Sequence, residues 1–284
     1  MPPITGDTSD KIGIIAGGGQ FPLLFAKAVH RQGLRVYAAA HKGETDEALA
    51  DEVDSLKWVK LGQLGRIISF FRDEGVKKTV FIGSITKTNI FRDVRPDLKG
   101  LGLWNKIDIK QDDAILRAVA DRLEKDGIEV VASTHYVPEL LFPRGILTRK
   151  KPTKDQINDI AFGWKIARSI GRLDIGQCVV VRNHTVLAVE AIEGTDATIH
   201  RGGSLGKERT VVVKLRKPKQ DLRFDLPAVG EKTIQSMQEV RAAVLAVEAG
   251  YALFFDREPV IRAADAAGIV IVGVAEKESG ELYF

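Results

Sequence analysis

A charged stretch in the second half of the 284-residue chain has a spacing that could serve catalysis. Read in steps of two, KPKQDLRFDLPAVG (217–230) places Asp221, Arg223 and Asp225 on one side, with mostly apolar residues between them. This alternation predicts a strand over 217–226 with one charged face, which Pro227 ends. Two carboxylates that bracket a guanidinium could bind a metal ion and a phosphate group.

Two neighbouring stretches carry more groups of the same kind. Glu193-Gly194-Thr195-Asp196 ends the expected strand TVLAVEAI, while Lys214 and Arg216 share one face of the expected strand TVVVKLR. We expect these groups to meet the charged face of 217–226 at one end of a sheet, with Thr195 contacting substrate. The alternative is a surface ladder of ion pairs, which stabilises a fold little. Oxygen ligands suit Mg²⁺ or Mn²⁺, and a metal flanked by cations suits the hydrolysis of a phosphoanhydride.

Two loops in the first half could contact the rest of a nucleotide. Gly17-Gly18-Gly19-Gln20 follows an apolar strand and precedes a helix, where backbone N–H groups can hold phosphate. Pro22 replaces the third glycine of the dinucleotide fingerprint, so an NAD site is disfavoured, and a plain tight turn stays open. Ser84 and Lys87 belong to the loop GSITKT, which lacks a glycine that the Walker A motif requires. Because this loop follows a strand of a parallel sheet, we expect the two residues to line a cleft at the strand ends.

The elements that must position these loops alternate between strand and helix. Residues 11–134 are predicted to form a Rossmann-like α/β domain with a parallel sheet. Its expected strands and helices are 11–16, 22–31, 34–40, 64–75, 77–85, 112–127 and 128–133. Residues 1–10 are expected to be a disordered tail, and the Pro-containing stretch 135–154 to be a linker.

Residues 155–284 are predicted to form a second α/β domain, with a mixed sheet that carries the metal and phosphate site. Its first two strands are expected to form a hairpin around Asn183-His184, and the strand 217–226 to follow the third. The other expected elements are helices at 153–171, 231–249 and 258–267 and strands at 177–182, 185–192, 210–216, 251–255 and 268–274.

Composition excludes several classes of protein. A net charge of +4 is too mild to indicate a nucleic-acid binder and suits an anionic small molecule. Cys178 lies in an apolar run, which favours a buried thiol over a nucleophile. The five histidines form no i, i+4 pair, so zinc is disfavoured. Without a signal peptide or a long apolar run, we expect a cytoplasmic protein.

The motifs IAGGGQFP, GSITK, QDDAIL, VLAVEAIEGTDATI and KQDLRFDLPAVGEKTI resemble those of the LpxI family, the UDP-2,3-diacylglucosamine pyrophosphatases of lipid A biosynthesis. The resemblance extends from about residue 11 to residue 274. It implies metal-dependent hydrolysis of UDP-2,3-diacylglucosamine to UMP and 2,3-diacylglucosamine 1-phosphate (lipid X). From the residues themselves, we expect the reaction in a cleft between two domains. The resemblance also implies that Asp225 binds the metal or activates the water.

The same resemblance implies supporting roles for five further residues. Asp196 and Glu193 would be metal ligands, with Mg²⁺ as the natural ion. Lys214 and Arg223 would clamp phosphate, and Asp221 would orient Arg223.

A lipid substrate adds expectations about partners. Two acyl chains predict an oily chamber between the domains. The stretch ELLFPRG with the basic run 149–151 would border that chamber or make transient contact with the inner-membrane surface, and a solvated linker is the alternative. A homodimer through the C-terminal sheet is plausible. An oxidoreductase that binds a dinucleotide and a non-catalytic UDP-sugar sensor remain alternative functions.

Overall fold

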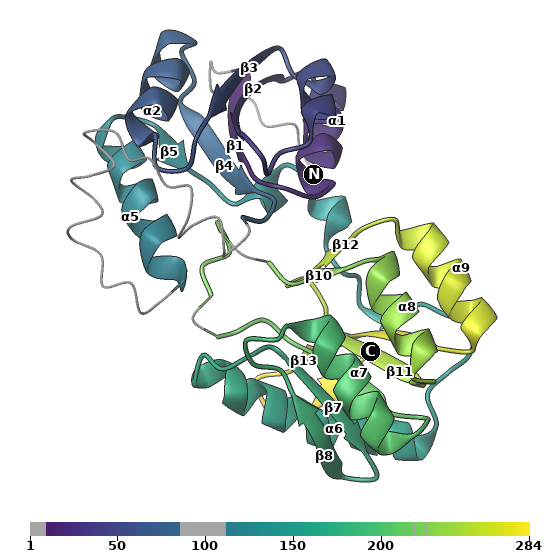
Figure 1. Cartoon of the computed structure of the whole chain (residues 1–284). Helices are drawn as coiled ribbons and strands as arrows, with labels where there is room; N and C mark the ends of the chain where they lie inside the picture. The colour runs from purple at the N-terminus through teal and green to yellow at the C-terminus, as the bar shows by residue number, and fades with distance from the viewer. Residues whose placement is uncertain (1–9, 86–111, 219, 225) are drawn as a thin grey trace. The chain divides into compact units, whose positions relative to one another are not determined.

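A computed structural model describes residues 10–85, 112–218, 220–224 and 226–284 (Figure 1). The chain forms two compact units. The first comprises the residues up to Pro138 together with the short segment Asp221–Phe224. The second comprises Glu139–Gln220 and the chain that follows the segment. None of the helices in the described ranges is long and apolar enough to cross a membrane.

The first unit is built on a five-stranded parallel sheet, which confirms the predicted parallel-sheet architecture. The strand order is β3-β2-β1-β4-β5. The strands are β1 (Lys11–Ala16), β2 (Arg35–His41), β3 (Ser55–Val59), β4 (Lys78–Ile82) and β5 (Glu129–Val130). β3 was not predicted, because SLKWV has a charged residue at its centre and little apolar periodicity.

Helices cover this sheet on both faces (Figure 1). Apolar side chains of α2 and α5 form one core with those of the strands, including Ile68, Phe71 and Leu123. α1 covers the opposite face with its buried residues Phe25 and Val29. The helices are α1 (Phe21–Arg31), α2 (Leu64–Asp73) and α5 (Asp112–Lys125), with the 3₁₀ turns η1 (Glu47–Glu52) and η2 (Ser133–His135).

The second unit has a seven-stranded mixed sheet, as the sequence predicted. Its centre is three parallel strands in the order β13-β11-β9, and β7, β8, β6 and β14 add to it in antiparallel pairings. The strands are β6 (Gly145–Ile146), β7 (Cys178–Arg182), β8 (Thr185–Val189), β9 (Val211–Lys214), β11 (Val244–Glu248), β13 (Val270–Glu276) and β14 (Leu282–Tyr283). β10 (Ala228–Val229) and β12 (Leu253–Phe254) form a separate parallel pair.

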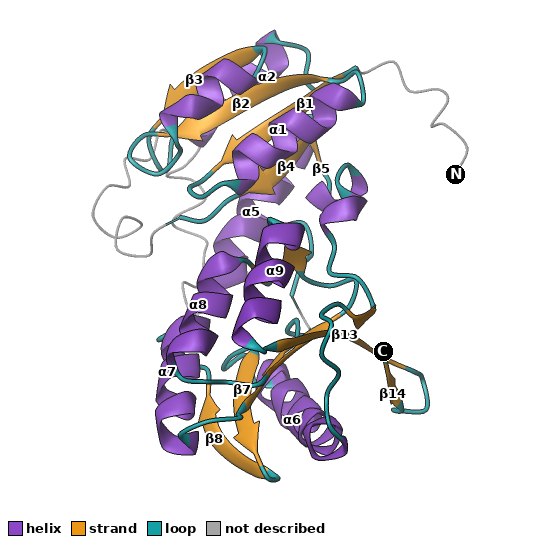
Figure 2. Ribbon diagram, turned by 90° about the vertical axis from the view of Figure 1, so that its right-hand side faces the viewer, coloured by secondary structure: helices purple, strands orange, loops and turns teal. Residues whose placement is uncertain are grey.

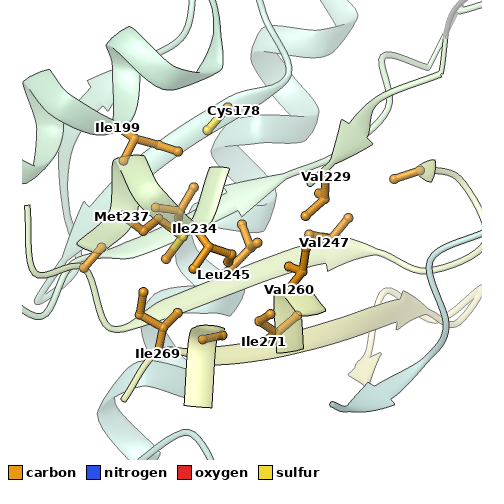
Figure 3. Close-up of a cluster of buried hydrophobic side chains, with 14 of the residues drawn as sticks. Cys178, Ile199, Val229, Ile234, Met237, Leu245, Val247, Val260, Ile269 and Ile271 are labelled. Atoms are coloured by element: carbon orange, nitrogen blue, oxygen red, sulfur yellow. The ribbon is translucent and has the colours of Figure 1, made fainter. Parts of the chain in front are cut away.

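Alternate residues of the central strands enter two different cores. Val211 and Val213 pack under α6, whereas Val212 packs with α7, α8 and α9 on the other face. Figure 2 shows α6 on one side of the sheet and the other three helices opposite it, and Figure 3 shows the core beneath those three. The helices are α6 (Lys154–Arg172), α7 (Thr195–Gly206), α8 (Glu231–Glu239) and α9 (Arg257–Ala267), with the 3₁₀ turn η3 (Pro138–Leu140).

The predicted hairpin between β7 and β8 is confirmed. Asn183 and His184 have φ angles of 49° and 55°, the left-handed pair that a two-residue type I′ turn requires. The buried carboxylate of Asp159 accepts both of their backbone N–H groups, at 2.9 and 2.8 Å. This acid therefore holds the hairpin against α6 and has a structural role.

Two predictions for the second domain are wrong, and one of its helices was not predicted. The stretch 217–226 is not a strand: among its described residues, 218 and 222–224 are in turns and the others have no regular secondary structure. The helix predicted over 231–249 ends at Glu239, and Val244–Glu248 is the central strand β11. Finally, α7 was not predicted, because its sequence TDATIHRGGSLG has two adjacent glycines and weak helix propensity. Those glycines let the helix lie close to its neighbours, since a Cβ at Gly202 would meet Val180 at 2.6 Å.

Candidate active site

The glycine turn and the loop that carries Ser84 lie together in the first unit. In the sheet, β1 lies between β2 and β4. The strand that follows β1 in the chain, β2, pairs with one edge of β1, and β4 pairs with its other edge. Ligands of open α/β sheets bind at this switch point, beyond the carboxyl ends of the strands. Gly18 N–H donates to the Ser84 carbonyl at 2.7 Å, and Ser84 N–H donates to the Gly18 carbonyl at 3.1 Å. The structure therefore brings these two predicted substrate loops side by side.

Close approach of the backbone explains the glycines of these loops. A Cβ at Gly17 would lie 2.5 Å from the backbone oxygen of Ser84, and one at Gly18 would lie 2.9 Å from the backbone oxygen of Glu44. Gly19 has open space around it but a φ of +87°, a conformation that L residues rarely adopt. Packing of the loops thus accounts for Gly17 and Gly18, and backbone conformation accounts for Gly19.

A buried network fixes the end of β1 where the glycine turn begins. Both His41 Nδ1 and Thr45 Oγ1 bond the carbonyl oxygen of Ala16, at 2.8 and 2.7 Å. Burial lowers the pKa of His41, so its imidazole is neutral at neutral pH. His41 ends the second strand, where a dinucleotide site would carry an acid.

Gln20 stands at the N-cap of α1, and the first turn of that helix has no acidic residue. The positive end of the helix dipole is therefore not offset by an acid of the first turn, which suits an anionic ligand at this loop. Lys87, the last predicted substrate contact of this unit, lies outside the described residues.

In the second unit, Lys214 is buried at the carboxyl end of β9. Its side chain is 5% exposed, and its Nζ donates to the carbonyl oxygen of Ala228 at 2.8 Å. Cys178 is its register partner on β7. Burial raises the pKa of the Cys178 thiol, so this group stays protonated and is no nucleophile.

Glu190 is a buried carboxylate beside Lys214 that sequence reasoning missed. It directly follows β8 and is 6% exposed. Thr195 Oγ1 donates to its Oε1 at 3.1 Å, while its Oε2 is buried without a hydrogen-bond partner among the described residues. Burial raises the pKa of Glu190, and the nearby Lys214 ammonium, the Thr195 hydrogen bond and a backbone hydrogen bond from Gln177 oppose that shift. In the sequence, the sign that Glu190 is buried is its position at the end of the apolar run VLAVE.

Glu193 and Asp196 flank the start of α7 but face different cations. Glu193 pairs with Arg201 through Oε1 and accepts the backbone N–H of Ala191 at 3.2 Å through Oε2. Its bond to its own backbone N–H and the Arg201 guanidinium hold its pKa below the ordinary value. Asp196 Oδ2 lies 3.0 Å from Lys232 Nζ, an exposed amine of α8. Asp196 lies in the first turn of α7, directly after Thr195, whose hydroxyl donates to Glu190.

Arg216, just beyond β9, is held by a buried acid of the neighbouring strand. Its backbone N–H donates to Glu248 Oε2 at 3.0 Å, and Arg168 of α6 pairs with the same carboxylate at 3.2 Å. The Arg216 guanidinium also stacks on the ring of Tyr251, 3.8 Å from its centroid. Arg216 and Lys214 therefore place two cations at the carboxyl end of the central strands, where ligands of such sheets bind.

Asp221 and Arg223 belong to the first unit. Arg223 Nη2 donates to Asp221 Oδ2 at 2.9 Å, and its Nη1 donates to Glu124 Oε1 at 3.0 Å. Two carboxylates thus engage the guanidinium that was predicted to clamp phosphate. Asp225 lies outside the described residues, and Pro227, two residues further on, accepts Leu253 N–H at 2.7 Å.

The oxygen-rich character of the site fits a hard divalent cation. Glu190 offers a buried oxygen without a hydrogen-bond partner, and Thr195 and Asp196 add further oxygens nearby. In the described ranges, no three His, Cys, Asp or Glu side chains are arranged to hold a metal ion.

Comparisons with known proteins decide the family. The LpxI N-terminal domain matches residues 11–140, and the LpxI C-terminal domain matches residues 143–272. The chain belongs to the LpxI family. Its sequence is 37% identical over 279 residues to the UDP-2,3-diacylglucosamine pyrophosphatase LpxI of Caulobacter vibrioides, an alignment that covers 94% of this chain and 99% of that protein. The predicted LpxI resemblance is confirmed.

Two solved structures resemble this LpxI-family chain only weakly. The biotin carboxylase subunit of pyruvate carboxylase is 13% identical, with a TM-score of 0.26, and the match covers 61% of this chain and 35% of that one. A biotin carboxylase domain of the Hydrogenobacter thermophilus 2-oxoglutarate carboxylase is 11% identical, with a TM-score of 0.27, and the match covers 98% and 63%. Likeness at this level does not define a shared architecture.

Proposed function

We propose that this chain hydrolyses the pyrophosphate of UDP-2,3-diacylglucosamine, releasing UMP and 2,3-diacylglucosamine 1-phosphate. The observation that carries the proposal is the match to the Caulobacter vibrioides pyrophosphatase over nearly the full length of both chains. The geometry supports it in two places. One is the pair of loops at the switch point of the first unit. The other is at the strand ends of the second unit, where the buried Lys214 and the buried Glu190 interact electrostatically.

In this proposal a water molecule forms a new P–O bond as the bridging P–O bond of the pyrophosphate breaks. The phosphate that leaves keeps the bridging oxygen and its electron pair, and a carboxylate accepts the proton of the water. Asp225 is the proposed acceptor, because it is the acid of the motif RFDLPAVG, which resembles the family motif. Positioned general bases of this kind accelerate reactions by about 10²–10⁴-fold.

Lys214 is proposed to stabilise charge on the phosphate oxygens. Its ammonium is buried and already oriented by the Ala228 carbonyl, so little reorganisation would accompany the reaction. Arg216, fixed by Glu248 and Tyr251, is a second cation at the same strand ends. Arg223 has no place in this step, because its guanidinium is paired with Asp221 and Glu124.

A divalent cation, Mg²⁺ or Mn²⁺, is proposed as the cofactor. Bound there, it would neutralise phosphate oxygens and lower the pKa of a water molecule. Asp225, Asp196 and Glu190 are the proposed ligands. In this set of ligands, Glu190 replaces Glu193, which was predicted from the sequence. Glu193 is paired with Arg201 through one oxygen and accepts the Ala191 N–H through the other. Glu190 Oε2, in contrast, has no hydrogen-bond partner among the described residues.

Hydrolysis of UDP-2,3-diacylglucosamine, followed as UMP release, tests the proposal. Wild type is expected to release UMP with Mg²⁺ and to lose activity in EDTA. Asp225→Ala is expected to lose activity by about 10²–10⁴-fold, while Asp51→Ala, which removes an exposed acid of η1, serves as the matched control. Absence of UMP release by wild type with metal would overturn the activity. Tight UDP-sugar binding without turnover would instead favour the sensor function.

A further inference from the structure

A chain of charged side chains in the second unit leads from α6 to the carboxyl end of the central strands. Arg168 of α6 donates through Nη2 to Glu276 Oε2 at 2.7 Å and to Glu248 Oε1 at 3.2 Å. Glu248 ends β11 and is 5% exposed. Its other oxygen, Oε2, accepts the backbone N–H of Arg216 at 3.0 Å. One buried carboxylate thus joins α6, which covers one face of the sheet (Figure 2), to the residue two positions beyond Lys214.

The guanidinium of Arg216 is held by a carboxylate and by an aromatic ring. Its Cζ lies 3.8 Å from the centroid of the Tyr251 ring. Its buried Nε lies 3.9 Å from Glu248 Oε1, close enough for an ion pair but too far for a hydrogen bond. Stacking on the ring and attraction to the carboxylate together restrict the plane of the guanidinium.

The terminal nitrogens of Arg216, Nη1 and Nη2, have no hydrogen-bond partner among the residues that the structure describes. Arg168 and Arg223 differ, because carboxylates accept from their terminal nitrogens. The Arg216 side chain is 25% exposed, so a ligand can reach it. An oriented guanidinium of this kind matches the oxygens of a phosphate group bidentately. Its place after β9, at the carboxyl ends of parallel strands, is where ligands of such sheets bind.

We propose that Arg216 binds one phosphate group of the substrate through Nη1 and Nη2, and that Glu248, Arg168 and Tyr251 are positioning residues that hold its guanidinium for this contact. The inference rests on the proposed function and goes beyond a second positive charge at the strand ends. A point charge can be supplied by lysine, whereas a bidentate contact requires the planar guanidinium. Arg168 acts on the reaction through Glu248.

Arg216→Lys separates a point charge from a bidentate contact in the UMP-release assay. The variant is expected to lower kcat/KM by about 10²-fold, close to the effect of Arg216→Ala, because lysine keeps the charge but loses the paired donors. Arg216→Lys with the activity of wild type would overturn the inference.

Glu248→Gln tests the positioning role, with Glu276→Gln as the matched control. Both carboxylates accept from Arg168 Nη2, and Glu248 also contacts Arg216. Glu248→Gln is expected to lower kcat/KM by about 10–100-fold, because a misplacement of about 1 Å can cost this much, whereas Glu276→Gln should stay within about threefold of wild type. In the Arg216→Ala background, Glu248→Gln should cause no further loss. Loss by the same factor in both backgrounds would refute the positioning role.

Replacement of Tyr251 tests the same role without a change in buried charge. Tyr251 is 36% exposed, so its variants are expected to fold, and thermal unfolding checks this for every variant. Tyr251→Leu should lower kcat/KM by about 3–10-fold, and Tyr251→Phe, which keeps the ring under the guanidinium, should retain most of the activity. Equal activity of the two variants would contradict the role of the ring.

Binding of inorganic pyrophosphate, measured by isothermal titration calorimetry, separates the inference from the proposed function because it needs no turnover. Arg216→Lys is expected to bind pyrophosphate about 10-fold more weakly than wild type, as for lost hydrogen bonds to a charged group. This result with a wild type that releases no UMP would overturn the hydrolysis and support the phosphate site. Equal affinities of wild type and Arg216→Lys, or no binding by wild type, would overturn the inference itself.

Discussion

Replacement of Gly17 by alanine tests whether the glycine turn serves loop packing or phosphate binding. The added Cβ would lie 2.5 Å from the Ser84 carbonyl oxygen and 3.0 Å from the Ser84 nitrogen. Both contacts are with backbone, so relief requires a shift of one loop. Overpacking of this kind costs about 1–3 kcal/mol. The shift also weakens the two hydrogen bonds between Gly18 and Ser84, each worth about 1 kcal/mol.

The expected loss in the free energy of unfolding is therefore about 2–4 kcal/mol, measured by urea denaturation. Gly19→Ala, in the same turn, meets no atom within 4 Å and should cost only the roughly 1–2 kcal/mol of a left-handed alanine. Gly230→Ala, with open space and an extended backbone, should be nearly neutral. A Gly17→Ala enzyme as stable as wild type, with a raised KM, would refute the packing argument and favour direct contact with substrate.

Three further predictions concern the second unit. Gly203→Ala should destabilise by about 1–3 kcal/mol in urea denaturation, because its Cβ would lie 2.3 Å from that of Val240; a neutral result would contradict this packing. Burial raises the pKa of Glu190, so wild type should lose stability relative to Glu190→Gln as pH rises from about 4 to 7; equal stability curves would refute it. Lys214→Met should lower kcat by about 10²-fold in the UMP assay; an unchanged kcat would remove Lys214 from the reaction.

Amphipathic and buried patterns with clear ends could be predicted from the sequence. α6 begins at a capping box, in which Thr153 Oγ1 accepts Gln156 N–H and the Gln156 side chain accepts Thr153 N–H. Four of the five parallel strands of the first unit, all except β3, were predicted because each is a short apolar run. The hairpin turn could be predicted from Asn183 and His184, of which asparagine tolerates a positive φ well.

The missed elements depend on tertiary contacts that a single sequence does not display. All five residues of β11, Val244–Glu248, are buried, so this strand lacks alternation and reads as the continuation of α8. α7 forms despite Gly202 and Gly203, because they let it approach Val180 and Val240 closely. Glu190 was overlooked for a similar reason: an acid at the end of an apolar run reads as a boundary, whereas the folded chain buries it beside Lys214.

The error over 217–226 has a definite physical cause. An i, i+2 spacing of polar residues is shared by strands and by turns in which an aspartate bonds the backbone two residues on. Here Arg223 N–H donates to Asp221 Oδ1 at 3.1 Å, which is the turn form. Apolar Phe224 then packs against the core of the first unit. The residues that were predicted to share one face of a strand therefore include a turn in which Asp221 and Arg223 pair, and Asp225 follows two residues later in the sequence.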